Sequence, residues 1–448
     1  MDTLQALFNT LGNWVWGPAM LILLVGTGVW LTVLLRGIQF SKLPFALRQA
    51  FGKPPGQDNK PGDVSHFAAL MTALSATIGT GNIAGVATAV VLGGPGAVFW
   101  MWITAIFGMA TKYAEGILAV HYRVVNSKGE MAGGPMYYIE RGLKLKWLAV
   151  LFALFAVLAS FGIGSSVQSN SVAQSIEASF GVAPMLTGVV LTVLTALVIL
   201  GGIKSIARVA SVIVPVMAVI YVLGGLIIIG LNLELLGPAI KLIFVDAFTG
   251  EAVAGGAVGA AIRYGVARGV FSNEAGMGSA PIAAAAAKTD HPGRQALVSM
   301  TGTFLDTIVV CSITGLVLVM GNMYTSGQTG AALTTHTFNA LLPGWGGYLV
   351  TFGLVFFAYS TILGWCYYGE KCAAYLLGDK MIIPYRIVYV ASVMLGTVAS
   401  LDLVWAASDT FNGLMAVPNL IALLLLSGVV VRQTKDFFNK LDTGELPR

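Results

Sequence analysis

The sequence predicts an all-α polytopic membrane protein of about 11 transmembrane helices, in which a five-plus-five inverted repeat follows one extra N-terminal helix. The composition, the distribution of basic residues and a short internal repeat support this prediction. Of the 448 residues, 56% are hydrophobic and only 10% are charged, whereas a soluble domain has about 25% charged residues. The formal net charge of +5 indicates basic cytoplasmic loops rather than nucleic-acid binding.

Eleven apolar stretches are interpreted as membrane spans. The first of them is too long for the core of a signal peptide and has no Lys or Arg before it, so we expect it to be retained. Residues 235–247 and 331–342 are expected to form shorter helices outside the membrane. The spans cover approximately residues 14–35, 64–92, 97–122, 147–176, 184–202, 207–231, 254–287, 296–320, 347–368, 387–401 and 403–431.

Basic residues are distributed asymmetrically between alternate loops. With the N-terminus outside and the C-terminus inside, nearly all of the 25 Lys and Arg residues fall in inside segments or within spans, and only Lys241 falls outside. Because cytoplasmic loops are enriched in basic residues, this distribution supports an odd number of spans and this orientation. The alternative is a miscounted pair of short spans, since the last two stretches share a very short connection.

A four-residue pattern occurs twice, as Asn82-Ile83-Ala84-Gly85 and as Asn273-Glu274-Ala275-Gly276. The two copies are five spans apart, and because five is odd they must have opposite orientations in the membrane. This predicts an inverted repeat. The predicted units are residues 1–63 with the extra span and a cytoplasmic loop, 64–231 with the first half, 232–432 with the second half, and 433–448 as a cytoplasmic tail.

The segment from Ser75 to Gly85 is a poor sequence for a continuous helix, because it contains three glycines, two threonines and an asparagine. Unwound backbone at membrane depth is tolerated only where it is buried or lines a cavity. A helix that restarts after the break would present the N–H groups of Thr80 and Gly81 to a substrate carboxylate. The released carbonyls suit a hard cation such as sodium. The alternative is a close helix crossing built on small residues.

The second break follows Phe271, which is expected to wall the pocket, while Ser272 and Asn273 line it. Glu274 is an acid within a span and therefore a functional candidate by default. Its structural alternative is an internal ion pair with Arg268 or Arg263. Carbonyl groups at this break would receive a substrate ammonium group.

Three further groups of polar residues lie within spans. The Phe357 carbonyl and the hydroxyls of Ser360 and Thr361 converge at helical spacing, which suits sodium, although such hydroxyls often bond only to their own helix. Gln168 lies in a polar run and would bond a substrate amine or carboxylate, or else a neighbouring helix. Lys112 and Glu115 are spaced as an i, i+3 pair.

The segment Gly93–Trp102, with the sequence GGPGAVFWMW, resembles the signature of the alanine/glycine:cation symporter family. The segments Thr77–Gly85 and Ser272–Gly278 also resemble that family, and the similarity covers essentially the whole chain. It implies a LeuT-type fold and sodium-driven uptake of alanine or glycine in a bacterium or archaeon.

A wider resemblance to neurotransmitter:sodium symporters implies roles for individual residues. The substrate carboxylate would bind the N–H groups of Thr80 and Gly81. Phe271 and Trp365 would stand in for the aromatic lid of those relatives. Apart from the resemblance, a small pocket walled by Phe271, with Gly276 at the second break, would favour small side chains. One sodium ion would bind Ser75, Ile78, Phe357, Ser360 and Thr361, and a second would use Thr77 and Asn82, which is also a candidate substrate residue.

The predicted function is a sodium-coupled symporter that imports small neutral amino acids by alternating access, in the cell membrane of a prokaryote. The alternative is a proton-coupled or exchange-only amino-acid carrier that uses Glu274 or Asp306. An enzyme is not expected, because the sequence has no catalytic dyad, metal cluster or nucleotide-binding loop. Sodium is expected as the coupling ion, with no other cofactor.

Overall fold

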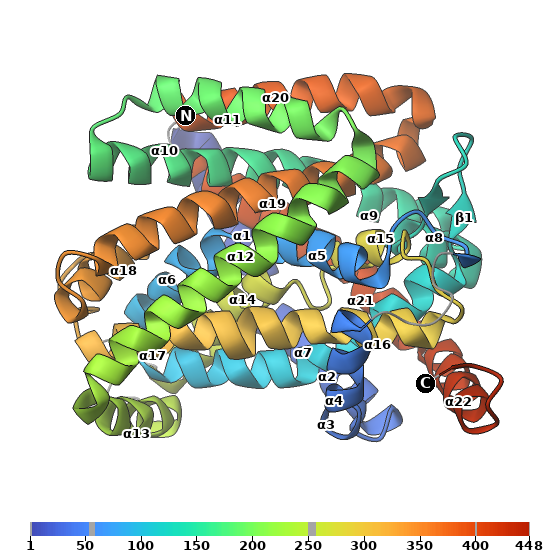
Figure 1. The fold of residues 1–448 in the computed structure, drawn as a ribbon, viewed down its shortest axis with the longest axis horizontal. Coiled ribbons are helices and arrows are strands. Elements are labelled where there is room, and N and C mark those ends of the chain that lie inside the picture. Colours follow the sequence, from blue (N-terminus) through green and yellow to red (C-terminus); the bar gives the residue numbers. More distant parts are fainter. Residues whose placement is uncertain (1, 53–58, 250–256, 399–400, 448) are drawn as a thin grey trace.

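The computed structural model describes residues 2–52, 59–249, 257–398 and 401–447 of the chain. Almost all of these residues lie in helices that pack into one bundle (Figure 1). Within the described ranges the one sheet is an antiparallel hairpin that pairs β1 (Val124–Val125) with β2 (Met131–Ala132). The all-α fold class predicted from the sequence is confirmed.

The first predicted span corresponds to α2 (Pro18–Leu34). This helix starts at a proline, whose fixed φ angle suits the first turn of a helix. It is preceded by α1 (Asp2–Val15), a helix that the sequence did not predict, and the two are bent by 42° relative to each other. Two short helices follow, α3 (Ile38–Ser41) and α4 (Leu43–Phe51).

The next part of the chain contains the first predicted break and two stretches of π-helix, η3 and η4. π-Helical turns are frequent at functional sites. The elements are α5 (His66–Thr77), the 3₁₀ turn η2 (Thr80–Asn82), α6 (Ala84–Gly93), α7 (Gly96–His121), α8 (Pro135–Tyr138), η3 (Ile139–Leu143), α9 (Lys146–Ala159), η4 (Ser160–Ser166), α10 (Val167–Phe180), α11 (Pro184–Ile199) and α12 (Gly202–Leu231).

The remaining part contains the second predicted break and a third π-helical stretch, η5. The elements are α13 (Leu233–Thr249), α14 (Ala257–Asn273), α15 (Ala280–Ala284), α16 (Pro292–Thr303), η5 (Phe304–Cys311), α17 (Ser312–Gly321), α18 (Gly330–Leu341), α19 (Gly346–Leu377), η6 (Asp379–Met381), α20 (Ile382–Val398), α21 (Leu401–Leu425) and α22 (Ser427–Asp442).

Among the described residues, seven helices are long and apolar enough to cross a membrane, or eight if α1 and α2 form one bent span. Two shorter apolar helices, α6 and α11, account for further predicted stretches. The remaining stretches contain the shorter helices on either side of the two breaks. The count of eleven spans and the division into repeat halves stay predictions. Both helices expected outside the membrane are present as α13 and α18.

The bundle has a buried centre and an apolar periphery. In the most apolar 18-residue segment of α7, 83% is buried, whereas only 33% is buried in the corresponding segments of α12 and of the helix that includes α20. Helix α7 packs against α14 and α16, and α11 lies beside α20 at one edge of the bundle (Figure 1). Large apolar side chains are exposed along α11 and α12, as lipid-facing surfaces require. The two broken helices therefore lie against the most buried helix.

Candidate functional site

The first break lies between α5 and α6. Helix α5 ends at Thr77, the chain makes the 3₁₀ turn η2, and α6 starts at Ala84. A glycine is required at position 79, because a Cβ atom there would lie 2.4 Å from the Thr361 hydroxyl and 3.3 Å from Gln168 Oε1. The missing side chain lets α19 and α10 approach the unwound backbone.

Five oxygen atoms from this break and from α19 form a buried cluster. Ser360 Oγ donates to the Ser75 carbonyl at 3.2 Å and to the Phe357 carbonyl at 2.9 Å. Thr361 Oγ1 donates to the Ile78 carbonyl at 3.3 Å and to the same Phe357 carbonyl at 3.0 Å. All five residues are at most 2% exposed. The three carbonyls and two hydroxyls are uncharged oxygen ligands, which suit a hard monovalent cation.

The backbone N–H groups after the cluster point to side chains of the pocket. Gly79 N donates to Asn82 Oδ1 at 2.9 Å, and Thr80 N donates to Gln168 Oε1 at 3.3 Å. Gln168 is fixed by a second bond, from its Nε2 to the Ile163 carbonyl in the π-helical stretch η4 at 3.0 Å. Gln168 Oε1 therefore accepts the hydrogen bond of the Thr80 N–H group, which the sequence predicts to bind the substrate carboxylate.

Asp306 connects the two breaks. Asn82 Nδ2 donates to Asp306 Oδ1 at 2.7 Å, while Ser272 Oγ and Thr307 Oγ1 donate to Asp306 Oδ2 at 2.9 and 2.7 Å. The carboxylate lies in the π-helical stretch η5 and is fully buried. Asn82 belongs to the first break and Ser272 to the end of α14, so one carboxylate bonds to both broken helices.

The second break is held by a carboxylate from α7. Glu274, Gly276 and Gly278 have φ angles of +56°, +88° and +85°, the left-handed region that glycine adopts without strain. Glu115 Oε1 accepts bonds from the Gly276 and Gly278 N–H groups at 3.1 and 3.2 Å and from Asn419 Nδ2 at 2.7 Å. Successive N–H groups in such turns form an anion-binding concavity, and Glu115 fills it.

The predicted pair of Lys112 and Glu115 is not formed within the part of the chain that the structure describes. Glu115 Oε1 is taken up by the second break, while Glu115 Oε2 and Lys112 Nζ are buried without a hydrogen-bond partner. The suggested pairing of Glu274 with an arginine is also absent among the described residues. Glu274 Oε2 accepts from Ser279 Oγ at 2.5 Å, Arg268 pairs with another acid, and Arg263 donates to an asparagine of α1.

Phe271 forms the roof of the first break. Its ring lies 3.1 Å from the position of a Cβ atom added to Gly81, and it stacks on Trp405 with ring centroids 5.9 Å apart. Above it, Arg268 Nη2 lies 3.2 Å from Asp409 Oδ2. A vestibule of about 310 Å³ lies outside this layer. Its lining includes Phe8, Asn13, Trp16, Arg263, Tyr264, Arg268, Phe271 and Asp409.

The other predicted substrate residues have different surroundings. Asn273 donates to Thr307 Oγ1 at 3.1 Å. Gly276 faces Leu420 and Leu24, where a Cβ atom would come within 3.1 Å of both side chains. Trp365 packs against the π-helical stretch η4 that precedes Gln168. Asn273 thus contacts η5, and Gly276 lies against side chains of α2 and α21.

Sequence reasoning missed Asn419, Trp405 and the anchoring role of Glu115. Asn419 and Glu115 are 304 residues apart, and no local pattern joins them. The fold also places Asp409 beside Arg268, 141 positions away in the sequence. The sequence shows only that a polar residue lies within an apolar helix. That pattern does not identify the residue's hydrogen-bond partner.

The whole chain is similar to one family of known proteins. The family model described as "Sodium:alanine symporter family" matches residues 1–448. The sodium/alanine symporter AgcS of Methanococcus maripaludis is 61% identical over 440 residues, which cover 96% of this chain and 97% of that protein. The putative sodium/proton-dependent alanine carrier protein YrbD of Bacillus subtilis is 40% identical, with 96% of this chain and 92% of that protein covered.

Among solved structures, MhsT in complex with L-phenylalanine matches with a TM-score of 0.55 at 14% identity, covering 83% of this chain and 98% of that chain. At this identity the likeness concerns the fold alone. The LeuT-type architecture implied by the sequence resemblance is thereby confirmed.

Proposed function

This chain belongs to the sodium:alanine symporter family, and we propose that it imports alanine or glycine together with sodium by alternating access. The observation that carries this proposal is the oxygen cluster of Ser75, Ile78, Phe357, Ser360 and Thr361, which joins a broken helix to α19. Helix breaks of this kind hold coupling ions and charged solutes in transporters.

Sodium at this cluster would order the first break. The carbonyls of Ser75 and Ile78 come from the last turn of α5 and the residue after it, where the helix dipole is negative. A bound cation would attach this end to α19, and the two hydroxyls would turn their hydrogens away from the ion. The same backbone continues into the N–H groups of Thr80 and Gly81. Sodium therefore raises the affinity for a carboxylate next to it, and linkage makes this effect reciprocal.

The substrate would enter the space between this break and Phe271. Its carboxylate would replace Gln168 Oε1 at the Thr80 N–H group and also bind Gly81 N. Its ammonium group would face the carbonyls at the end of α14. Because the Phe271 ring lies so close to Gly81, the space favours hydrogen or methyl as the substrate side chain. This supports glycine and alanine over larger amino acids.

The protein is embedded in a membrane, as its family and its apolar helices indicate. We place it in the plasma membrane of a prokaryote, with the N-terminus outside and the C-terminus inside. The asymmetric distribution of Lys and Arg supports this orientation. The vestibule next to Asp409 then opens to the outside, and the loop before α5 lies inside.

Reconstitution into liposomes tests this function. Labelled alanine uptake should require an inward sodium gradient and should vanish when potassium or choline replaces sodium. Alanine binding to the purified protein should strengthen as sodium is added. Equal binding with and without sodium would refute sodium coupling. Uptake that follows a pH gradient and ignores sodium would instead support proton coupling through Glu274 or Asp306.

A further inference from the structure

Lys112 is a buried cation whose charge has no direct partner. It lies in α7 and is 3% exposed, and its Nζ makes no hydrogen bond and no ion pair with any residue that the structure describes. A bare ammonium group in a membrane-embedded core is costly unless its surroundings are negative. The position of Lys112 therefore requires a source of negative potential.

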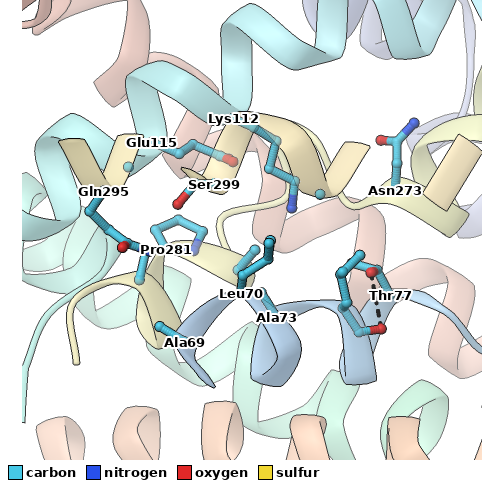
Figure 2. A pocket seen from close by; sticks show the side chains of 15 residues that line it. Ala69, Leu70, Ala73, Thr77, Lys112, Glu115, Asn273, Pro281, Gln295 and Ser299 are labelled. Atoms are coloured by element: carbon cyan, nitrogen blue, oxygen red, sulfur yellow. Dashed lines mark hydrogen bonds between the residues drawn. The ribbon is translucent and has the colours of Figure 1, made fainter. Parts of the chain in front are cut away.

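The ends of both broken helices supply part of that potential. Figure 2 shows the Lys112 side chain reaching from α7 toward α5, with Thr77 and Asn273 beside the same cavity. Thr77 is the last residue of α5 and Asn273 the last residue of α14. Helix C-termini carry partial negative charge and unpaired carbonyls, and they favour cations. Lys112 thus stands where two such ends meet.

Three buried acidic residues also lie near Lys112. The charges of Glu115, Glu274 and Asp306 all interact with the charge of Lys112. All three residues are at most 3% exposed. Among the described residues, Lys112 is the cation that acts on all of them. Lys112 therefore lies among the buried acidic side chains at the two breaks.

The cavity beside Lys112 is small. The cavity that it shares with Thr77 and Asn273 measures about 20 Å³, which is enough for about one water molecule. Thr77 Oγ1 is bonded to the Leu74 carbonyl at 3.3 Å. Asn82, named with Thr77 for a second sodium ion, bonds instead to Asp306.

We propose that Lys112 is a tethered cation that supplies the positive charge of a second coupling ion, so that the carrier moves one sodium ion with each amino acid. Broken-helix transporters attract cations to half-helix C-termini and released carbonyls. In this chain one such position is the neutral oxygen cluster, which binds a mobile ion. The other position is occupied by the ammonium group of Lys112. This inference rests on the proposed sodium coupling and adds its stoichiometry.

The reversal potential of the reconstituted full-length protein tests the stoichiometry directly. With equal sodium on both sides and a tenfold alanine gradient, flux stops at about 60 mV if one charge moves and at about 30 mV if two charges move. The inference expects the larger value, and the smaller one overturns it. A complete lack of sodium-dependent flux would refute the proposed function itself. That result can be told apart from a reversal potential of either value.

Variants at Lys112 test the role of the side chain. Lys112→Met removes the charge at similar length, and the Hill coefficient for sodium in alanine uptake should rise from about 1 toward about 2. Lys112→Arg keeps a cation and should retain the lower coefficient. Lys204→Met, an exposed lysine on α12, is the control for loss of charge. An unchanged sodium dependence in folded Lys112→Met overturns the inference; if that variant does not fold, the reversal potential still decides.

Discussion

Replacing Thr361 by valine removes one oxygen from the proposed sodium site and keeps the shape of the side chain. Thr361 Oγ1 is bonded to the Ile78 carbonyl at 3.3 Å and to the Phe357 carbonyl at 3.0 Å. The Phe357 carbonyl retains its bond from Ser360, whereas the Ile78 carbonyl loses the contact to α19. The substitution should therefore weaken the contact between the first break and α19.

The expected loss can be estimated from the single ligand removed. A hydrogen bond or polar contact to a charged group contributes about 1.5–3 kcal/mol, so sodium affinity should fall about 10- to 150-fold. Thr361→Ser keeps the hydroxyl and should stay within about threefold of the unmodified protein, because the ligand set is unchanged. The buried Ile78 carbonyl left unpaired should lower the free energy of unfolding by about 1–3 kcal/mol.

The assay is alanine binding to purified protein across a sodium titration, with thermal unfolding measured on the same samples. Saturating sodium should restore alanine binding by Thr361→Val, because the carboxylate site itself is intact. If Thr361→Val and Thr361→Ser both keep the sodium dependence of the unmodified protein, the oxygen cluster does not bind the coupling ion. If saturating sodium does not restore binding in folded Thr361→Val, the hydroxyl acts on the substrate site instead.

Three further substitutions test neighbouring parts of the site. Gly79→Ala places a Cβ atom 2.4 Å from Thr361 Oγ1, so sodium-dependent uptake should be lost while circular dichroism stays helical; retained uptake would show that the break has room. Asp409→Asn breaks the pair with Arg268, whose side chains are 20% and 22% exposed, and should speed release of labelled alanine to the outside by about two- to fivefold; unchanged release would exclude this pair from the outer closure. Phe271→Ala should admit larger neutral amino acids such as leucine, measured by competition against alanine uptake; a selectivity that stays the same would place the substrate elsewhere.

The positions of the breaks could be predicted from the sequence because the signal is local. Glycine, threonine and asparagine interrupt an apolar stretch, and α5 ends at Thr77 with α6 starting at Ala84, within the predicted segment. The grouping of Ser360, Thr361 and the Phe357 carbonyl follows from helical spacing. Their approach to Ser75 and Ile78, which are more than 280 positions away in the sequence, could be predicted only through the internal repeat and the family resemblance.

Long-range polar partners could not be predicted. Asp306 bonds to Asn82 across 224 positions, and its side chain is aimed by a π-helical stretch that depends on tertiary packing. The Lys112–Glu115 pair was expected from spacing alone, but the second break offers Glu115 two N–H groups in fixed directions. A charge-assisted bond to such groups is stronger than a pair on a helix surface.

Residues of the two broken helices also form the contacts that close the candidate site on its two sides. On the proposed inner side, Asp63 N donates to the Ala286 carbonyl at 2.8 Å and Lys288 N to the Val64 carbonyl at 2.7 Å, so the chain before α5 pairs with the chain after α15. Arg123 strengthens this pairing by donating to the carbonyls of residues 285 and 287.

On the proposed outer side, the closure consists of the ion pair of Arg268 with Asp409 and the stacking of Phe271 on Trp405. Arg268 and Phe271 belong to α14, which ends two residues after Phe271. Both sets of contacts are therefore formed in this structure, and each is attached to a helix half that ends at the proposed sodium and substrate sites. Because Asp306 bonds to both breaks, an ion or carboxylate that orders one break acts on the other. This connection gives alternating access a physical basis: ligand contacts at the breaks bias which closure opens.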